Sequence, residues 1–245
     1  MKKAIITLTK GYSHPVEYKD LIIRNKFIEE NIKEVCDIIV FHEGNIAPEH
    51  QIFIKNSTSL SVNFISIPSF EKIEGVEFDT TYGQGFGWGY RHMCNFWFVG
   101  FWKYLDAYDL VIRIDDDCLI RSSVDDIFES LESRVCVYGG WAYDDEFVTK
   151  GLNDFSISFF GEERGRKNPS GPYTNLVGFN LKKIRQSPKF FDYVKAVESS
   201  NNIFIYRWGD LPLWGEALHY IFNQDDHSAI NIKYYHSSHS KFINY

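Results

Sequence analysis

Short apolar runs separated by a helix-like segment dominate the first part of the chain. The runs 4–8, 37–42 and 62–67 are rich in Ile, Val and Phe, and apolar residues between the first two recur at helical spacing. This alternation of strand, helix and strand is typical of a parallel sheet. Such sheets bind ligands beyond the carboxyl ends of their strands, where Thr9 and Glu43 follow the first two runs.

The remainder of the chain predicts further strands and helices. Strands are expected at 110–114, 135–138, 174–181 and 230–235, and helices at 88–104, 122–131, 182–199 and 213–222. The segments 74–87 and 150–172 carry several glycines and charges, which predicts loops. No linker or internal repeat divides the chain. We therefore expect one α/β domain over residues 1–245, with a mixed, mostly parallel central sheet flanked by helices.

Three adjacent carboxylates interrupt the most informative of these strands. The apolar run 110–114 breaks abruptly into Asp115, Asp116 and Asp117. In extended geometry Asp115 and Asp117 share a side, because side chains alternate with a period of two. Two hard oxygen ligands on one side suit Mg²⁺ or Mn²⁺, which in turn can hold a diphosphate. A solvated acidic turn is the alternative interpretation.

Composition narrows the choice of partner. Hydrophobic residues make up 44% of the chain and charged residues 24%, as in ordinary globular proteins. Aromatic residues reach 17% and can fill a core or form platforms for sugars and bases. A net charge of −7 argues against a general nucleic-acid binder, since phosphate contacts need a basic face. The four scattered cysteines and the lack of a membrane-length apolar run predict a soluble, cytoplasmic protein with free thiols.

Other candidate residues lie near predicted element ends. Tyr90 and Arg91 begin the 88–104 helix, whose amino end favours anions, so Arg91 is either a phosphate contact or the structural partner of an aspartate. Trp141 follows a strand and two glycines, which suits a sugar-stacking platform or a core side chain. Asp210 either acts in the site or caps the helix that follows it.

Three strings occur in an order and at spacings that resemble one known family. They are Tyr-Arg-His-Met-Cys at 90–94 followed by Phe-Trp, Ile-Arg-Ile-Asp-Asp-Asp at 112–117, and Arg-Trp-Gly-Asp-Leu-Pro at 207–212. The chain resembles the fungal α-1,2-mannosyltransferases, whose members have the glycosyltransferase A (GT-A) fold. The first string is the most specific, and the likeness covers roughly residues 85 to 240.

The resemblance implies a retaining, metal-dependent enzyme that moves mannose from GDP-mannose to a hydroxyl of a glycan acceptor with Mn²⁺ or Mg²⁺ as cofactor. Asp115 stands where the family has its metal-binding acid, although the family has Glu-Pro there and this chain has three aspartates. We therefore expect Asp115 and Asp117 as metal ligands. Tyr90, Arg91, Asp115 and Thr9 are expected at the donor, and Trp141 at the acceptor.

Two departures from the family leave part of the mechanism open. The metal-binding His of the family falls on Trp214, so we expect His236 or His239 to supply the third ligand. The proposed nucleophilic Glu falls near Val177, where this chain has no carboxylate. Either the enzyme retains configuration without a covalent intermediate, or it inverts with Asp210 as general base.

Alternative functions also fit these residues. A catalytically silent protein that binds nucleotide sugars or glycans would explain both departures. A transferase that uses a UDP-sugar donor fits the same carboxylates, and so does a nucleotidyltransferase of similar architecture. The last is disfavoured because the chain lacks a Gly-rich, Arg/Lys-bearing loop near residue 10.

Overall fold

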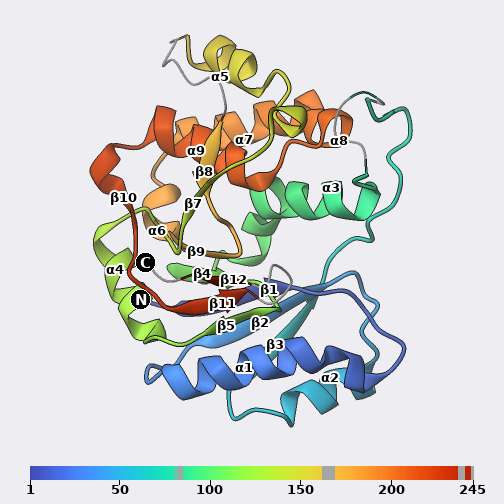
Figure 1. Cartoon of the computed structure of the whole chain (residues 1–245), viewed down its shortest axis with the longest axis vertical. Coiled ribbons are helices and arrows are strands. Elements are labelled where there is room, and N and C mark those ends of the chain that lie inside the picture. The colour runs from blue at the N-terminus through green and yellow to red at the C-terminus, as the bar shows by residue number, and fades with distance from the viewer. Residues whose placement is uncertain (80, 82–84, 162–168, 237–240, 244–245) are drawn as a thin grey trace.

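A seven-stranded sheet forms the centre of the protein (Figure 1). The computed structural model describes residues 1–79, 81, 85–161, 169–236 and 241–243. The strands in spatial order are β10 (His227–Ala229), β6 (Cys136–Tyr138), β9 (Leu176–Asn180), β4 (Leu110–Ile114), β1 (Lys3–Leu8), β2 (Asp37–His42) and β3 (Ser61–Ser66). Only β9 runs antiparallel to its neighbours β4 and β6. The predicted mixed, mostly parallel sheet is therefore confirmed.

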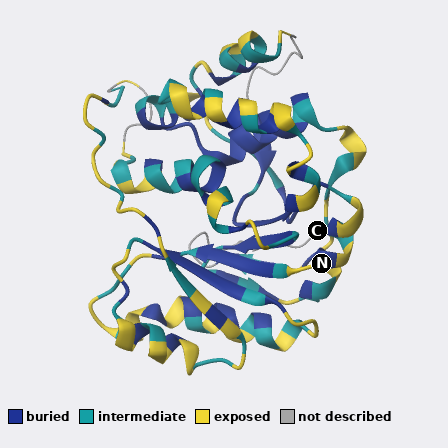
Figure 2. Ribbon diagram, turned by 180° about the vertical axis from the view of Figure 1, so that it is seen from behind, coloured by how far each residue is buried: buried dark blue, intermediate teal, exposed yellow. Residues whose placement is uncertain are grey.

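Helices cover both faces of this sheet. One face carries α1 (Lys19–Asn31), α2 (Pro48–Lys55) and α4 (Val124–Ser133). The other carries α3 (Trp88–Asn95), α6 (Leu181–Ile184), α7 (Pro188–Ser200), α8 (Asn202–Tyr206) and α9 (Asp210–Ile221). Side chains of β1 alternate between the two cores, with Ile5 in one and Ala4 and Ile6 in the other. Figure 2 shows the central strands buried and the outer sides of the helices exposed.

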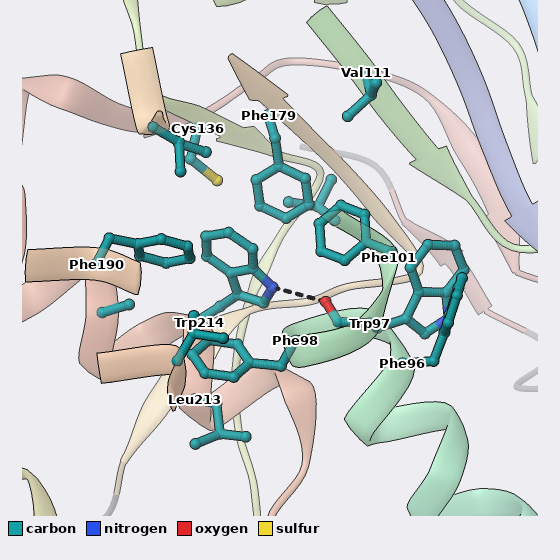
Figure 3. Packing of buried hydrophobic residues seen from close by; sticks show 14 of the residues in the cluster. Phe96, Trp97, Phe98, Phe101, Val111, Cys136, Phe179, Phe190, Leu213 and Trp214 are labelled. Carbon is teal, nitrogen blue, oxygen red and sulfur yellow. Dashed lines mark hydrogen bonds between the residues drawn. The ribbon is translucent and has the colours of Figure 1, made fainter. Parts of the chain in front are cut away.

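The predicted 88–104 helix changes its winding twice. After α3 the chain forms a π-helical turn (Phe96–Gly100) and then a 3₁₀ turn (Phe101–Tyr104). A π turn presents its side chains at an irregular spacing, and here it directs several rings into one core (Figure 3). Trp214 of α9 joins that core, and its indole nitrogen donates to the carbonyl of Trp97 at 3.4 Å.

Some sequence expectations for the later half were wrong. Residues 150–172 are not one loop, because α5 (Leu152–Phe160) and a short strand, β8 (Ser170–Pro172), form within them. Gly161, one of the glycines that suggested a loop, lies at the end of α5, and Gly151 lies at its start; both have left-handed backbone angles. The helix expected from residue 213 begins at Asp210. Pro212 is accommodated in its first turn, where a helix needs no backbone N–H.

Short elements around the main sheet form the rest of the structure. The strand expected at 230–235 is confined to β11 (Tyr234–His236), and the edge strand β10 was not expected. A small sheet combines β11 with β5 (Cys118–Ile120) and β12 (Lys241–Ile243), and another pairs β8 with β7 (Trp141–Tyr143). The remaining 3₁₀ turns are η1 (Pro15–Tyr18), η4 (Glu146–Val148) and η5 (Gln224–Asp226). Among the described residues, none of the helices has the length and apolar character to cross a membrane.

Two glycines let α9 lie directly against β8. A Cβ atom at Gly215 would sit 1.7 Å from the carbonyl oxygen of Ser170, and one at Gly171 would sit 1.9 Å from that of Leu211. Neither neighbour is the end of a flexible side chain, so backbone would have to move. This close approach sets the position of α9, and with it the position of Asp210 at the start of the helix.

We expect Gly215→Ala to destabilise the fold by about 3 kcal/mol, the upper part of the range for overpacking, because backbone cannot yield as a side chain can. Urea denaturation followed by circular dichroism measures the change. Gly100→Ala is the matched control, since a Cβ there meets only a Phe96 side-chain atom at an ordinary 3.5 Å. Equal stabilities of the two variants would contradict this account of the α9 packing.

Candidate active site

The acidic triplet lies in a turn between β4 and β5. The amide of Cys118 donates to the carbonyl of Asp115 at 3.1 Å, which closes the turn over Asp116 and Asp117. The expectation that Asp115 and Asp117 share one side of an extended strand was therefore wrong. Because the backbone reverses here, each of the three carboxylates meets a different partner.

Asp117 meets His236 from the far end of the chain. Strand β11 pairs antiparallel with β5 so that His236 stands opposite Cys118. His236 Nε2 lies 3.3 Å from Asp117 Oδ1, and the hydroxyl of Tyr173 lies 3.2 Å from its Nδ1. Potential ligand atoms of Asp117, Cys118 and His236 all lie within 4.8 Å of one another. The structure thus brings Asp117 and His236 together, and their predicted role as metal ligands stays a prediction. His239, the other expected candidate for the third ligand, falls outside the described residues.

Asp115 and Asp210 meet at one buried guanidinium. Arg113 Nε donates to Asp115 Oδ1 at 2.8 Å and Nη2 to Oδ2 at 3.3 Å, while Nη1 donates to Asp210 Oδ2. The guanidinium also lies over the ring of Trp97, 4.3 Å from its centroid. Arg113 was not singled out from the sequence. A cationic residue inside an otherwise apolar strand was the signal that could have revealed it.

The turn is an acidic environment, and a second arginine, Arg24, donates a hydrogen bond to the strand that leads into it. Burial raises the pKa of Asp115, and it raises the pKa of Asp116 to about 6. Arg24 of α1 is fully buried, and burial lowers its pKa to about 10 although the nearby Asp116 favours its charge. Its Nη2 donates to the carbonyl of Ile114 at 3.1 Å. Carboxylates held close together in this way favour a cation in the site.

Thr9 lies at the carboxyl end of β1, as expected. Its hydroxyl donates to Asp116 Oδ2 at 2.7 Å, which stabilises the charged carboxylate. Thr9 is buried, so the hydrogen bond ties β1 to the turn after β4. Its predicted contact with a donor nucleotide stays a prediction.

The guanidinium of Arg91 donates hydrogen bonds to backbone carbonyls. Its side chain is buried, Nε donates to Phe86 at 2.9 Å, and Nη1 donates to Phe204 at 2.7 Å. The guanidinium also stacks on Phe78, 4.0 Å from the ring centroid. This arrangement joins the segment before α3 to α8. It favours a structural role, in which backbone carbonyls accept hydrogen bonds from the guanidinium.

Tyr90 belongs to a second charged group beside the site. Its hydroxyl accepts a hydrogen bond from Arg207 Nη2 at 2.8 Å, and Nη1 of the same arginine contacts Asp144 Oδ2 at 3.2 Å. Arg207 has a left-handed backbone (φ 65°), three residues before Asp210. Gly209 lies between them, and a Cβ there would come within 2.7 Å of the Asp144 carboxylate. The sequence did not indicate Asp144, which follows the strand β7.

Trp214 and Val177 explain how this chain departs from the family pattern, and Trp141 is the residue expected at the acceptor. Trp214 packs in the core, stacked on Phe179 with centroids 4.1 Å apart (Figure 3). Val177 is buried on β9 directly opposite Arg113, so an apolar side chain replaces the implied carboxylate next to the site. Trp141 is half-buried, and its indole nitrogen donates to Ser170 Oγ at 2.8 Å. Its predicted contact with an acceptor stays a prediction.

Comparison of the sequence with known proteins identifies a relative. No family model matches the chain. The glycolipid 2-alpha-mannosyltransferase of Saccharomyces cerevisiae is 26% identical over 272 aligned positions, which include 96% of this chain and 60% of the relative. The chain is a homologue of this fungal mannosyltransferase. It spans about 60% of the relative's length.

Solved structures agree on the fold. The mannosyltransferase Ktr4p of S. cerevisiae superposes with a TM-score of 0.81 at 18% identity, covering 96% of this chain and 70% of that one. Core-mannan synthase A of Aspergillus fumigatus, solved in a Mn/GDP form, gives 0.80 at 16% identity over 96% and 74%. The galactosyltransferase LgtC gives 0.54 at 16% identity over 93% and 73%. This chain therefore has the expected GT-A fold.

We expect Arg113→Met to lower the free energy of unfolding by about 3–5 kcal/mol, because it leaves the buried Asp210 carboxylate without its partner. The double variant Arg113→Met/Asp210→Leu should recover most of this loss, since no buried charge then remains unpaired at Asp210. Urea denaturation at pH 7 measures both.

Lys72→Met serves as the control for the loss of an ion pair. Its partner Glu77 is exposed, so the change should cost less than about 1 kcal/mol. A similarly small cost for Arg113→Met would show that the buried pair is not a structural constraint.

Proposed function

We propose that this protein is a metal-dependent glycosyltransferase that moves mannose from GDP-mannose to a hydroxyl of a glycan acceptor. The observation that carries the proposal is the meeting of Asp117 and His236 beside the Arg113-bound carboxylates, at the carboxyl end of β4. Homology to a mannosyltransferase and the Mn/GDP form of a structural relative support the choice of donor and metal. Transfer from a UDP-hexose stays an alternative. The predicted cytoplasmic location stays a prediction.

The residues present fit a manganese ion. A carboxylate oxygen from Asp117 and an imidazole nitrogen from His236 are a donor set that Mn²⁺ accepts, whereas Mg²⁺ prefers oxygen alone. Burial raises the pKa of the Cys118 thiol well above its usual value, and a thiolate is a soft ligand that Mn²⁺ accepts less readily than oxygen or imidazole nitrogen. Asp115 can still contribute, because each oxygen bound to Arg113 keeps a further lone pair.

Tyr173 and Arg113 would position the groups that act. The Tyr173 hydroxyl at Nδ1 of His236 holds the ring so that Nε2 faces Asp117. The metal, when bound, supplies positive charge next to the leaving diphosphate. Arg113 keeps Asp115 and Asp210 in place without a change of geometry during the reaction.

Asp210 would act on the acceptor hydroxyl. Among the described residues, the hydrogen bond to the Asp210 carboxylate comes from Arg113 and is accepted by Oδ2 of Asp210. The other oxygen, Oδ1, is left to accept a proton or orient a hydroxyl. The side chain sits at the first residue of α9, held there by the glycine contact with β8. Since Val177 offers no nucleophile on the opposite strand, retention without a covalent intermediate and inversion both stay open.

A catalytically silent protein that binds nucleotide sugars is the second candidate. The observation in its favour is that an apolar Val177 faces the site where the resemblance implies a carboxylate. Such a protein would keep the metal and the donor but would not cleave the glycosidic bond to the diphosphate.

We expect Asp117→Asn and His236→Gln each to weaken Mn²⁺ binding by at least about a hundredfold, and Tyr173→Phe to weaken it by about tenfold, as for the loss of a residue that orients a ligand. Titration of free Mn²⁺ by electron paramagnetic resonance measures the affinity. Asp106→Asn removes one charge from an exposed carboxylate elsewhere and should leave binding unchanged. Full affinity in both ligand variants would place the metal elsewhere.

With Mn²⁺ and a mannoside acceptor, we expect release of GDP from GDP-mannose, little turnover of UDP-hexoses, and loss of activity in excess EDTA. Asp210→Asn should lower kcat by about 10²–10⁴ if Asp210 is the general base, with Mn²⁺ affinity retained. A coupled assay for GDP measures turnover. Tight binding of GDP-mannose without turnover of any donor would favour the silent protein.

A further inference from the structure

A cavity lies at the edge of the molecule, away from the proposed catalytic carboxylates. It has a volume of about 620 Å³ and lies between the end of α9, the turn η5 and the edge strand β10. Its lining includes Trp141, Leu218, Phe222, Asn223, Gln224 and His227. Since a helix rises 1.5 Å per residue, residues 218–222 lie roughly 12–18 Å along α9 from Asp210. We call it the edge cavity.

An oriented aromatic surface and two amides meet in the edge cavity. The indole nitrogen of Trp141 is already bonded to Ser170, which holds the ring in place. The ring of His227 is nearly parallel to it, at 17° with centroids 6.1 Å apart. Gln224 adds an amide group that can both donate and accept hydrogen bonds, whereas the Asn223 amide beside it already donates to Asp226 Oδ2 at 3.1 Å. A flat apolar surface next to amides matches a sugar ring, which has an apolar C–H face and a rim of hydroxyls.

The charge of the lining favours a neutral ligand. Lys, Arg, Asp and Glu are absent from the described residues that line the edge cavity. Burial lowers the pKa of His227 below its usual value of 6.5, so the imidazole is uncharged at neutral pH. His219 also lines the edge cavity, but a phosphate or a nucleotide would find no lysine or arginine among the described lining residues to bind it. The same surroundings suit a polyhydroxylated, uncharged ligand.

We propose that the edge cavity is a second carbohydrate-binding subsite, which holds a neutral hexose unit of a glycan at a distance from the site of transfer. This proposal rests on the proposed function only for the kind of glycan that is expected to bind. The separation along α9 suits a subsite for a part of the acceptor that does not react. Such a subsite would raise the affinity for longer acceptors without touching the donor.

The experiment measures binding of α-1,2-linked mannotriose by ligand-observed NMR, in EDTA and without donor, so that the metal site is not needed. We expect saturable binding to the wild-type protein. Trp141→Ala and Gln224→Ala should each weaken it at least tenfold. Tyr143→Ala is the matched control, because Tyr143 is an exposed aromatic residue on the same strand that does not line the edge cavity. It should bind as the wild type does.

Two results would overturn the proposal. One is the absence of saturable mannotriose binding to the folded wild-type protein. The other is unchanged binding in Gln224→Ala, which alters an exposed turn residue and so tests the subsite even if Trp141→Ala does not fold. Asp117→Asn separates this inference from the proposed function. It should lose Mn²⁺ binding and still bind mannotriose, whereas loss of both would place the sugar at the metal site.

Discussion

The charge of Arg113 is the constraint around which the centre of this protein is arranged. Its guanidinium is buried in the middle of the sheet, where an unpaired cation would be very unfavourable. It is satisfied by two carboxylates, one from the turn that follows its own strand and one from the start of α9. The same ion pairs therefore hold two distant segments together and place both carboxylates in the candidate site. The fold and the candidate site therefore share one set of contacts.

The acidic turn distributes its three carboxylates among three parts of the structure. Asp115 meets Arg113, Asp116 meets the end of β1, and Asp117 meets His236 on β11. Each contact joins the turn to a different element, so the turn is held from several sides. A loop that carries ligands for a metal and a diphosphate gains from such support, because preorganised groups need not be rearranged when the substrate binds.

Departures from the family pattern follow a physical logic. At the position of the implied metal-binding His, Trp214 completes a core of stacked rings and cannot reach a ligand. The antiparallel register of β5 and β11 brings a different imidazole to the same turn. The loss of one ligand position is thus compatible with a complete site. Strand β9 carries no carboxylate in place of the one implied near Val177, which is why stereochemistry stays open.

The apolar runs of the sequence were enough to predict the main strands, the flanking helices and the mixed sheet, because burial on two faces demands continuous hydrophobic stretches. The acidic triplet after the 110–114 run pointed to Asp115 and Asp117 as metal ligands, and the missing family histidine at Trp214 led to His236 or His239 as the expected third ligand. The direction of each carboxylate could not be predicted, because it depends on a turn that replaces the extended geometry expected at Asp116. The roles of Arg113 and Tyr173 could not be predicted either, because Asp210 and His236 lie far from them along the chain. Such pairings come from strand register and helix packing, which only the tertiary structure determines.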